Sequence, residues 1–135
     1  MTSHQIKVFF RTLFKFKSLR LAMFSWINAD IPKSTKFHHF GMSVVIGEGS
    51  KVGENCHIYH CVTLGDRYKI GKKTKHQPIL EDNVTIYPFS MVLGEVTVGR
   101  HSVIAAYSLV LDDVPPYSVV SGRPAKVINT LKNNE

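Results

Sequence analysis

Histidine is the residue type in this chain with the clearest potential for catalysis at neutral pH. Of the seven histidines, His38 and His39 stand directly before the first regular segment of the sequence, and His76 stands in a lysine-rich stretch with the composition of a loop. An imidazole titrates near neutral pH and can therefore remove the proton of a hydroxyl group. One imidazole at the rim of a folded core, with another on a loop that folds across it, would form a site for such a step.

The element that must position these histidines is a repeat of six residues. Aliphatic residues occupy the first position of each hexad, and the fifth positions are small or β-branched. The aliphatic first positions are Ile46, Val52, Ile58, Leu64, Leu80, Ile86, Val92, Val98, Ile104 and Val110. A unit this short cannot bury its own apolar face, so successive units must stack into a solenoid with one continuous core. A period of six predicts a parallel β-helix, and hence a mainly β fold.

The repeat is interrupted once, between Leu64 and Leu80, which are 16 positions apart. Ile70 and Gly71 can keep one further hexad in register, so we predict that about four extra residues bulge out within 71–79. An extruded loop in a regular stack is where specificity and chemistry tend to lie, and this loop carries His76. The repeat ends at Pro115 and Pro116, which cannot donate to a ladder of backbone hydrogen bonds.

The other four histidines fit structural or solvated positions. His4 lies close to the N-terminus, and His57 and His101 take outward or turn positions of their hexads. His60 is a single polar residue on a face predicted to be solvated, although it could lie near a groove. Single polar residues on such a face seldom have a functional role.

The N-terminal segment differs from the repeat in charge. Of the net charge of +7, residues 1–36 carry +6 and the remaining 99 residues carry +1. Aromatic and aliphatic residues alternate with the cations at spacings that predict a short amphipathic helical segment within 3–27, followed by a linker that contains Pro32. The helix would pack on the solenoid or a neighbouring subunit, or lie on an anionic membrane surface through residues 1–27. No motif for binding nucleic acid is present, so we expect none as a partner.

Composition and pattern together predict three regions. These are a basic helical segment with its linker over 1–37, a β-helix domain over 38–128 and a polar tail over 129–135. Cys56 and Cys61 are too few to form a disulfide framework, so we expect reduced thiols and a cytoplasmic location, with the inner face of the membrane as the alternative site. No apolar run approaches the roughly 20 residues that cross a bilayer.

Several motifs, taken together over residues 31–128, resemble the serine acetyltransferase branch of the hexapeptide-repeat acyltransferases. The matching segments are 39–41, 44–49, 52–58, 62–65, 76–79 and 121–126. The resemblance implies a left-handed parallel β-helix that assembles as a homotrimer, with the active site in the groove between subunits. It also implies acetyl-CoA as the acyl donor and no metal.

The resemblance assigns the catalytic roles to two histidines. His39 matches the general base of the family, and His76 matches the second active-site histidine on the extruded loop. One extra residue follows His39 relative to typical members, so His38 stays a candidate for the base. In serine acetyltransferases an Asp precedes the first histidine and an Arg precedes the second, and both touch the amino acid; His38 and Lys75 hold these places here.

Residues near the C-terminus resemble the CoA-binding part of the family. Ala105 and Ala106 match the coil along which pantetheine lies, where a backbone N–H would face the cofactor, although small turn residues explain them equally well. Gly122, Arg123 and Lys126 match the CoA-binding terminus, with Lys126 placed to meet a phosphate. The alternative is that this segment merely ends the solenoid and begins a terminal helix.

We therefore predict an acetyl-CoA-dependent O-acetyltransferase. The changes at His38 and Lys75 favour a hydroxyl of a sugar or glycan precursor as the acceptor over serine, and the acid that orients the base histidine has no counterpart in the sequence. Two alternatives stay open. One is a trimeric zinc hydratase of the carbonic anhydrase kind, with His57, His60 and His76 as ligands. The other is a non-catalytic β-helix scaffold.

Overall fold

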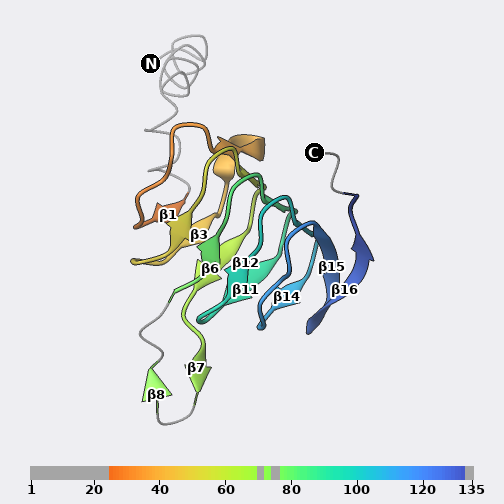
Figure 1. The fold of residues 1–135 in the computed structure, drawn as a ribbon. Helices are drawn as coiled ribbons and strands as arrows, with labels where there is room; N and C mark the ends of the chain where they lie inside the picture. The colour runs from red at the N-terminus through yellow and green to blue at the C-terminus, as the bar shows by residue number, and fades with distance from the viewer. Residues whose placement is uncertain (1–24, 70–71, 74–76, 133–135) are drawn as a thin grey trace, which may run out of the picture.

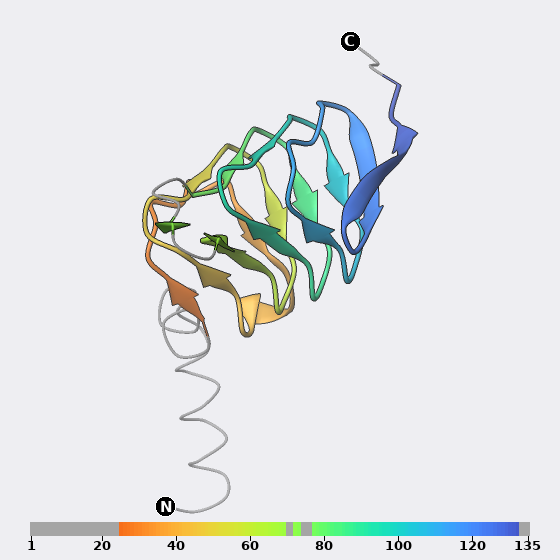
Figure 2. The same cartoon turned by 90° about the horizontal axis from the view of Figure 1, so that it is seen from below.

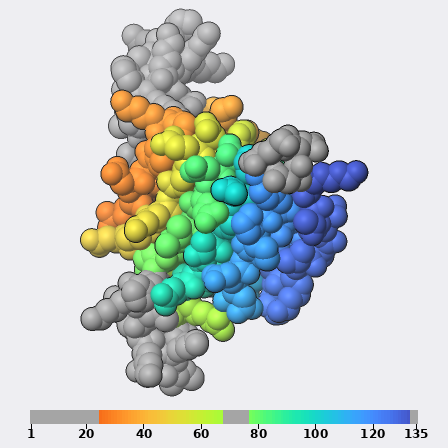
Figure 3. Space-filling model, in the orientation of Figure 1, coloured from red at the N-terminus to blue at the C-terminus, as the bar shows by residue number. Residues whose placement is uncertain are grey.

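The fold is a stack of triangular coils, seen along its side in Figure 1 and from below in Figure 2. The computed structural model describes residues 25–69, 72–73 and 77–132. Each short strand begins one residue before the first position of a hexad, and the chain turns a corner before the next strand. The coils form one continuous body from the first to the last, as the space-filling view shows (Figure 3).

Three sheets form the sides of the stack. One contains β1 (Trp26–Ile27), β3 (Val45–Ile46), β6 (Thr63–Gly65), β11 (Met91–Leu93) and β14 (Leu109–Val110), in that order. A second contains β2 (Lys36–Phe37), β5 (His57–Ile58), β10 (Thr85–Ile86), β13 (Val103–Ile104), β15 (Ser118–Gly122) and β16 (Ala125–Thr130). The third contains β4 (Lys51–Val52), β9 (Ile79–Leu80) and β12 (Thr97–Val98). All pairs within these sheets are parallel except β15 with β16. The predicted mainly β, parallel β-helix is therefore confirmed.

The first positions of the hexads form the core. Ile46 and Leu64 are directly paired between β3 and β6, and both are fully buried. Small residues at fifth positions fill the corners, where the hydroxyl of Ser90 donates to the Ala105 carbonyl at 2.8 Å and that of Ser102 to the Pro115 carbonyl at 2.8 Å. These hydrogen bonds satisfy hydroxyl groups that would otherwise be costly to bury.

The fourth position of most hexads makes the corner. Residues there have a left-handed backbone, with φ between 55 and 60° at Asn55, Cys61, Asn83, Phe89, His101 and Tyr107, and Tyr117 has the same conformation in the last coil. Because the corners repeat in register, side chains at equivalent positions of successive coils stack in rows. Cys56 and Cys61 are free thiols. Burial raises the pKa of the Cys56 thiol, which keeps this group protonated and unreactive.

The sheets extend beyond the predicted region at both ends. Trp26 pairs with Val45, and Phe37 pairs with Ile58, so the first coil forms before residue 38 and includes the predicted linker. At the other end β16 continues to Thr130, inside the predicted polar tail. Ladder hydrogen bonds to the neighbouring coil recruit both segments, although neither follows the repeat. The predicted helix lies outside the described residues apart from 25–27, of which Trp26 and Ile27 are strand.

The interruption also differs from its predicted register. In the third sheet Leu80 pairs with Val98 of β12 on one side and with Val52 of β4 on the other. Leu80 therefore takes the place predicted for Ile70, and ten residues rather than about four are inserted between Leu64 and Leu80. Part of the insertion is a hairpin of β7 (Tyr68–Lys69) and β8 (Lys72–Lys73), which projects from the stack in Figure 1. In the part of the chain that the structure describes, no helix has the length and apolar character to cross a membrane.

Candidate active site

The two adjacent histidines lie on an unusually long corner of the first coil. From Phe37 to Ile46 the chain takes nine positions, whereas the equivalent path in the next coil, from Ile58 to Leu64, takes six. The additional residues form a short 3-10 turn, η1 (His38–Gly41). Inside it His39 and Phe40 have φ of 49 and 64°. The regular corners have the same left-handed conformation, so it is the additional length that distinguishes this corner from the others.

Each of the two histidines is paired with a histidine of the second coil. His38 Nε2 lies 2.9 Å from His57 Nδ1, and His39 Nδ1 lies 2.8 Å from His60 Nδ1. The Tyr59 ring separates the two pairs. It stacks on His38 with centroids 4.2 Å apart and meets the edge of His39 at 5.7 Å. The structure thus brings four imidazoles together, two of which, His57 and His60, were predicted to be structural or solvated.

The electrostatic surroundings of His38 disfavour its charged form. Burial lowers the pKa of His38 below its usual value of 6.5, and the neighbouring His57, His39 and Lys36 lower it further. His38 is therefore a neutral imidazole at pH 7. Among the described residues, none of the hydrogen bonds of these four histidines goes to a carboxylate.

Aromatic rings connect this corner to the later coils. His60 meets the edge of Phe89 at a centroid distance of 5.3 Å, and Phe89 stacks on Tyr107 at 4.9 Å. Three steps of the second sheet, from β2 through β5 and β10 to β13, separate the two ends of the row, a distance of about 14 Å at about 4.8 Å a step. The row thus runs from His39 to the turn at Ala105–Tyr107.

The predicted cofactor residues meet at the far end of that row. Ile104 pairs with Val120, which places Ala105 and Ala106 alongside Ser121 and Gly122. The Ala105 N–H donates to the Val120 carbonyl at 2.9 Å, so this amide belongs to the ladder and is not available to a ligand. Ala106 is exposed at the corner and is the remaining candidate.

The C-terminal segment is a hairpin, because β16 runs antiparallel to β15. The alternative of a terminal helix is therefore wrong. Gly122 has φ of 109°, a conformation that favours glycine, and Arg123 and Pro124 form the exposed turn. Lys126 pairs with Ser121 across the hairpin, and its Nζ lies 3.9 Å from a carboxylate oxygen of Asp112, with both side chains more than 70% exposed.

Lys75 and His76 lie outside the described residues. The hairpin that precedes them leaves the stack at the end of β6, whereas η1 lies near the beginning of that strand, so the two are at opposite ends of the strands of the first sheet (Figure 1). The described residues contain no group of three or more His, Cys, Asp or Glu placed to hold a metal ion. His57 and His60 are each engaged with a different histidine.

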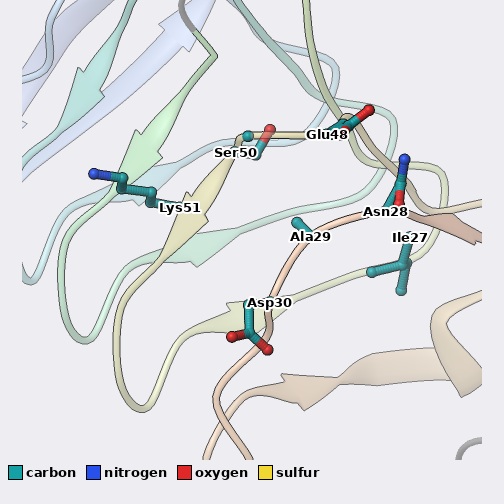
Figure 4. Close-up of a pocket in the computed structure, with 8 residues that line it drawn as sticks. Ile27, Asn28, Ala29, Asp30, Glu48, Ser50 and Lys51 are labelled. Atoms are coloured by element: carbon teal, nitrogen blue, oxygen red, sulfur yellow. The ribbon is translucent and has the colours of Figure 1, made fainter.

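A shallow depression elsewhere on the surface does not include the histidines. It lies where the first coil turns from the first sheet to the third, and Figure 4 shows the side chains that line it. The lining residues are Ile27, Asn28, Ala29, Asp30, Glu48, Gly49, Ser50 and Lys51. Asp30 is therefore at a different corner from His39.

Comparison with known proteins agrees with this fold and motif set. The bacterial transferase hexapeptide model, with six repeats, matches residues 77–112. The serine acetyltransferase of Bacillus licheniformis is 45% identical over 92 residues, which are 68% of this chain and 42% of that protein. Serine acetyltransferase 4 of Arabidopsis thaliana is 41% identical over 108 residues, 79% of this chain and 29% of that protein. The chain thus spans less than half the length of these relatives.

Solved structures give the same result. The serine acetyltransferase of Neisseria gonorrhoeae superposes with a TM-score of 0.66 at 33% identity, over 74% of this chain and 37% of that one. That of Brucella abortus, solved in complex with coenzyme A, gives a TM-score of 0.69 at 28% identity, over 86% of this chain and 46% of that one. The coils and the repeat define a hexapeptide-repeat β-helix protein. Within this family the chain belongs to the serine acetyltransferase-like branch, as its motifs predict.

Proposed function

We propose that the chain is an acetyl-CoA-dependent O-acetyltransferase whose acceptor is a hydroxyl group. The observation that carries the proposal is the row of side chains that links the extended His39 corner to the Ala106–Gly122 corner. A row of rings of this length suits the extended arm of a CoA thioester, with the acyl group delivered at the histidine end. The similarity to serine acetyltransferases, one of them solved with CoA, supports the same donor.

In this mechanism His39 acts as the general base. Its Nε2 takes the proton of the acceptor hydroxyl while the oxygen attacks the thioester carbonyl, and the tetrahedral intermediate then expels the CoA thiolate. A positioned general base contributes about 10² to 10⁴-fold to the rate. One good backbone donor to the developing oxyanion adds about 3 to 4 kcal/mol of transition-state stabilisation. His76 would position the acceptor or help to bear the developing charge.

The acceptor is proposed from the change in charge at the site. A serine substrate brings an ammonium and a carboxylate, but His38 is neutral and His57 is its hydrogen-bond partner. This corner therefore lacks the anionic group that serine acetyltransferases place before the first histidine. We propose a sugar or glycan-precursor hydroxyl as the acceptor. Serine is the second candidate, because the relatives are named serine acetyltransferases. Thiol release from acetyl-CoA, measured with serine, homoserine, amino sugars and glycan precursors, separates the two.

We expect the protein to form a trimer. The inserted hairpin and the His39 corner lie at opposite ends of the strands of one sheet, so in a ring of subunits the insertion of one chain can reach the histidines of the next. Apolar side chains are exposed along this sheet and its corner, among them Trp26, Phe40, Met42, Val45 and Met91. Sedimentation should give about three times the monomer mass of 15.2 kDa. A monomer that is stable at micromolar concentration would contradict a site shared between subunits.

Replacement of Lys126 tests the assigned CoA terminus. Because Lys126 is 72% exposed, its attraction to a CoA phosphate should resemble other exposed ion pairs, and Lys126→Ala should weaken CoA binding by about 0.2 to 1 kcal/mol, less so in high salt. Asp112→Asn is the matched control, because it removes the competing partner of Lys126 and should leave CoA affinity equal or higher. Calorimetric titration measures both. Equal CoA affinity in Lys126→Ala and wild type would remove the assigned contact.

A further inference from the structure

We propose that His60 is the positioning residue for His39, in the place that an acid takes in other base-catalysed sites. The inference rests on the proposed function, in which His39 is the general base. His60 would accept a hydrogen bond from His39 Nδ1–H and so hold the imidazole in the tautomer whose Nε2 lone pair faces the acceptor hydroxyl. An orienting partner of this kind selects the tautomer and supports the imidazolium that forms during the reaction.

The atoms of the contact permit only one arrangement for a base. The two Nδ1 atoms are 2.8 Å apart, so one of them carries the hydrogen and the other accepts it. If His60 donated, the proton of neutral His39 would sit on Nε2, and that nitrogen could not accept another. If His39 donates, its Nε2 is free and His60 carries its own proton on Nε2. When His39 gains a proton from the acceptor, its Nδ1–H···Nδ1 bond becomes charge-assisted and stronger.

His60 is better fixed than the residue it would orient. It lies between β5 and β6 on a corner of regular length, its ring meets the edge of Phe89 at 5.3 Å, and its carbonyl accepts the Phe89 N–H at 3.4 Å. His39 is exposed on the extended corner, which is three residues longer than the corner of His60. A hydrogen bond from the rigid second coil can therefore set the direction of a ring that the first coil holds less firmly.

The neighbouring pair supports the choice of His39 over His38. His38 uses Nε2 for its bond to His57, so the outer nitrogen of that ring is occupied and only Nδ1 is left. His39 uses Nδ1, which leaves the outer nitrogen for a substrate. The N···N distances of the two pairs are similar, but the pairs use different ring nitrogens. Only the His39–His60 pair leaves Nε2 of its first-coil histidine free.

Three substitutions of His60 separate this role from simple packing. In His60→Asn the side-chain carbonyl oxygen falls where Nδ1 was, so the acceptor is kept while the ring is lost. In His60→Phe the ring against Phe89 is kept while the acceptor is lost. In His60→Gln the acceptor moves one atom further out. His101→Phe, on a histidine that stacks on Tyr117 away from the site, is the control for a lost imidazole.

The expected order of activity is opposite for the two roles. A positioning role predicts that His60→Phe lowers kcat by about 10- to 100-fold, within the contribution of a general base, with KM changing less. It also predicts that His60→Asn stays within about threefold of wild type, with His60→Gln between them. The loss in His60→Phe should persist at alkaline pH, where the base is unprotonated. A packing role predicts that His60→Phe is the milder change and His60→Asn the more damaging.

A second measurement tests the pair without relying on activity. Nitrogen–proton correlation spectra of the imidazoles should show His39 protonated at Nδ1 in wild type and in His60→Asn, and as a mixture of tautomers in His60→Phe. Thermal unfolding of each variant reports whether the fold is retained. His39 protonated at Nε2 in wild type, or equal kcat in His60→Phe and wild type, would overturn the proposal. If wild type transfers no acetyl group, the proposed function fails, and the tautomer of His39 still decides the role of His60.

Discussion

His39→Ala should lower kcat by about 10² or more and leave the affinity for CoA nearly unchanged. The reason is that in the proposed mechanism the general base acts on the acceptor proton in the transition state, whereas CoA would be held mainly by the later coils. His39 is exposed on a corner that packs no part of the core, so the change should not unfold the protein. Thiol release measures kcat, and calorimetric titration measures CoA affinity.

The matched control is His38→Ala at the adjacent position. His38 is neutral and uses its Nε2 for His57, so its replacement should affect the KM of the acceptor more than kcat. If His38→Ala gives the large loss of kcat and His39→Ala does not, the base is His38 and the alignment with the family is displaced by one residue. Full activity in both variants would exclude a base on this corner.

Ile86→Ala should lower the free energy of unfolding by about 2 to 5 kcal/mol, the range observed when a large aliphatic side chain is removed from a core. Ile86 has no exposed surface, and its strand lies between Ile58 and Ile104 in the second sheet. In a stack of coils each inward side chain contacts the coils on both sides, so the cavity cannot close without shifting two neighbours. Chemical denaturation followed by circular dichroism measures the loss.

Ile79→Ala provides the comparison with the same change of side chain. Ile79 is 38% exposed on the outer face of β9, so its truncation removes less buried surface and should cost well under half as much as Ile86→Ala. Equal losses at the two positions would mean that the outer face of the third sheet is also buried, as it would be in contact with another subunit.

The architecture followed from the sequence because its cause is local and periodic. An aliphatic residue at every sixth position must be buried, and a six-residue unit can bury it only by stacking, so the ten first-position residues from Ile46 to Val110 were predicted as core and all are buried. His38 and His39 were singled out for the same reason, since they stand where the regular hexads begin. The small residues at 105 and 106 and the turn at Gly122 likewise follow from local pattern.

The partners of the candidate catalytic histidines depended on the tertiary structure. Residues one coil apart become neighbours, but His39 and His60 are 21 positions apart because the first coil contains a longer corner, which no periodic pattern reveals. The register after the insertion was likewise set by strand pairing. Leu80, rather than Ile70, pairs with Val52, which lies much earlier in the sequence. At both ends of the stack the hexad pattern is absent. Trp26 and Val127 become strand only because the exposed edge of the adjacent coil pairs with them. The periodic pattern of buried residues can be read from the sequence position by position, whereas contacts between irregular segments form only when the coils are stacked.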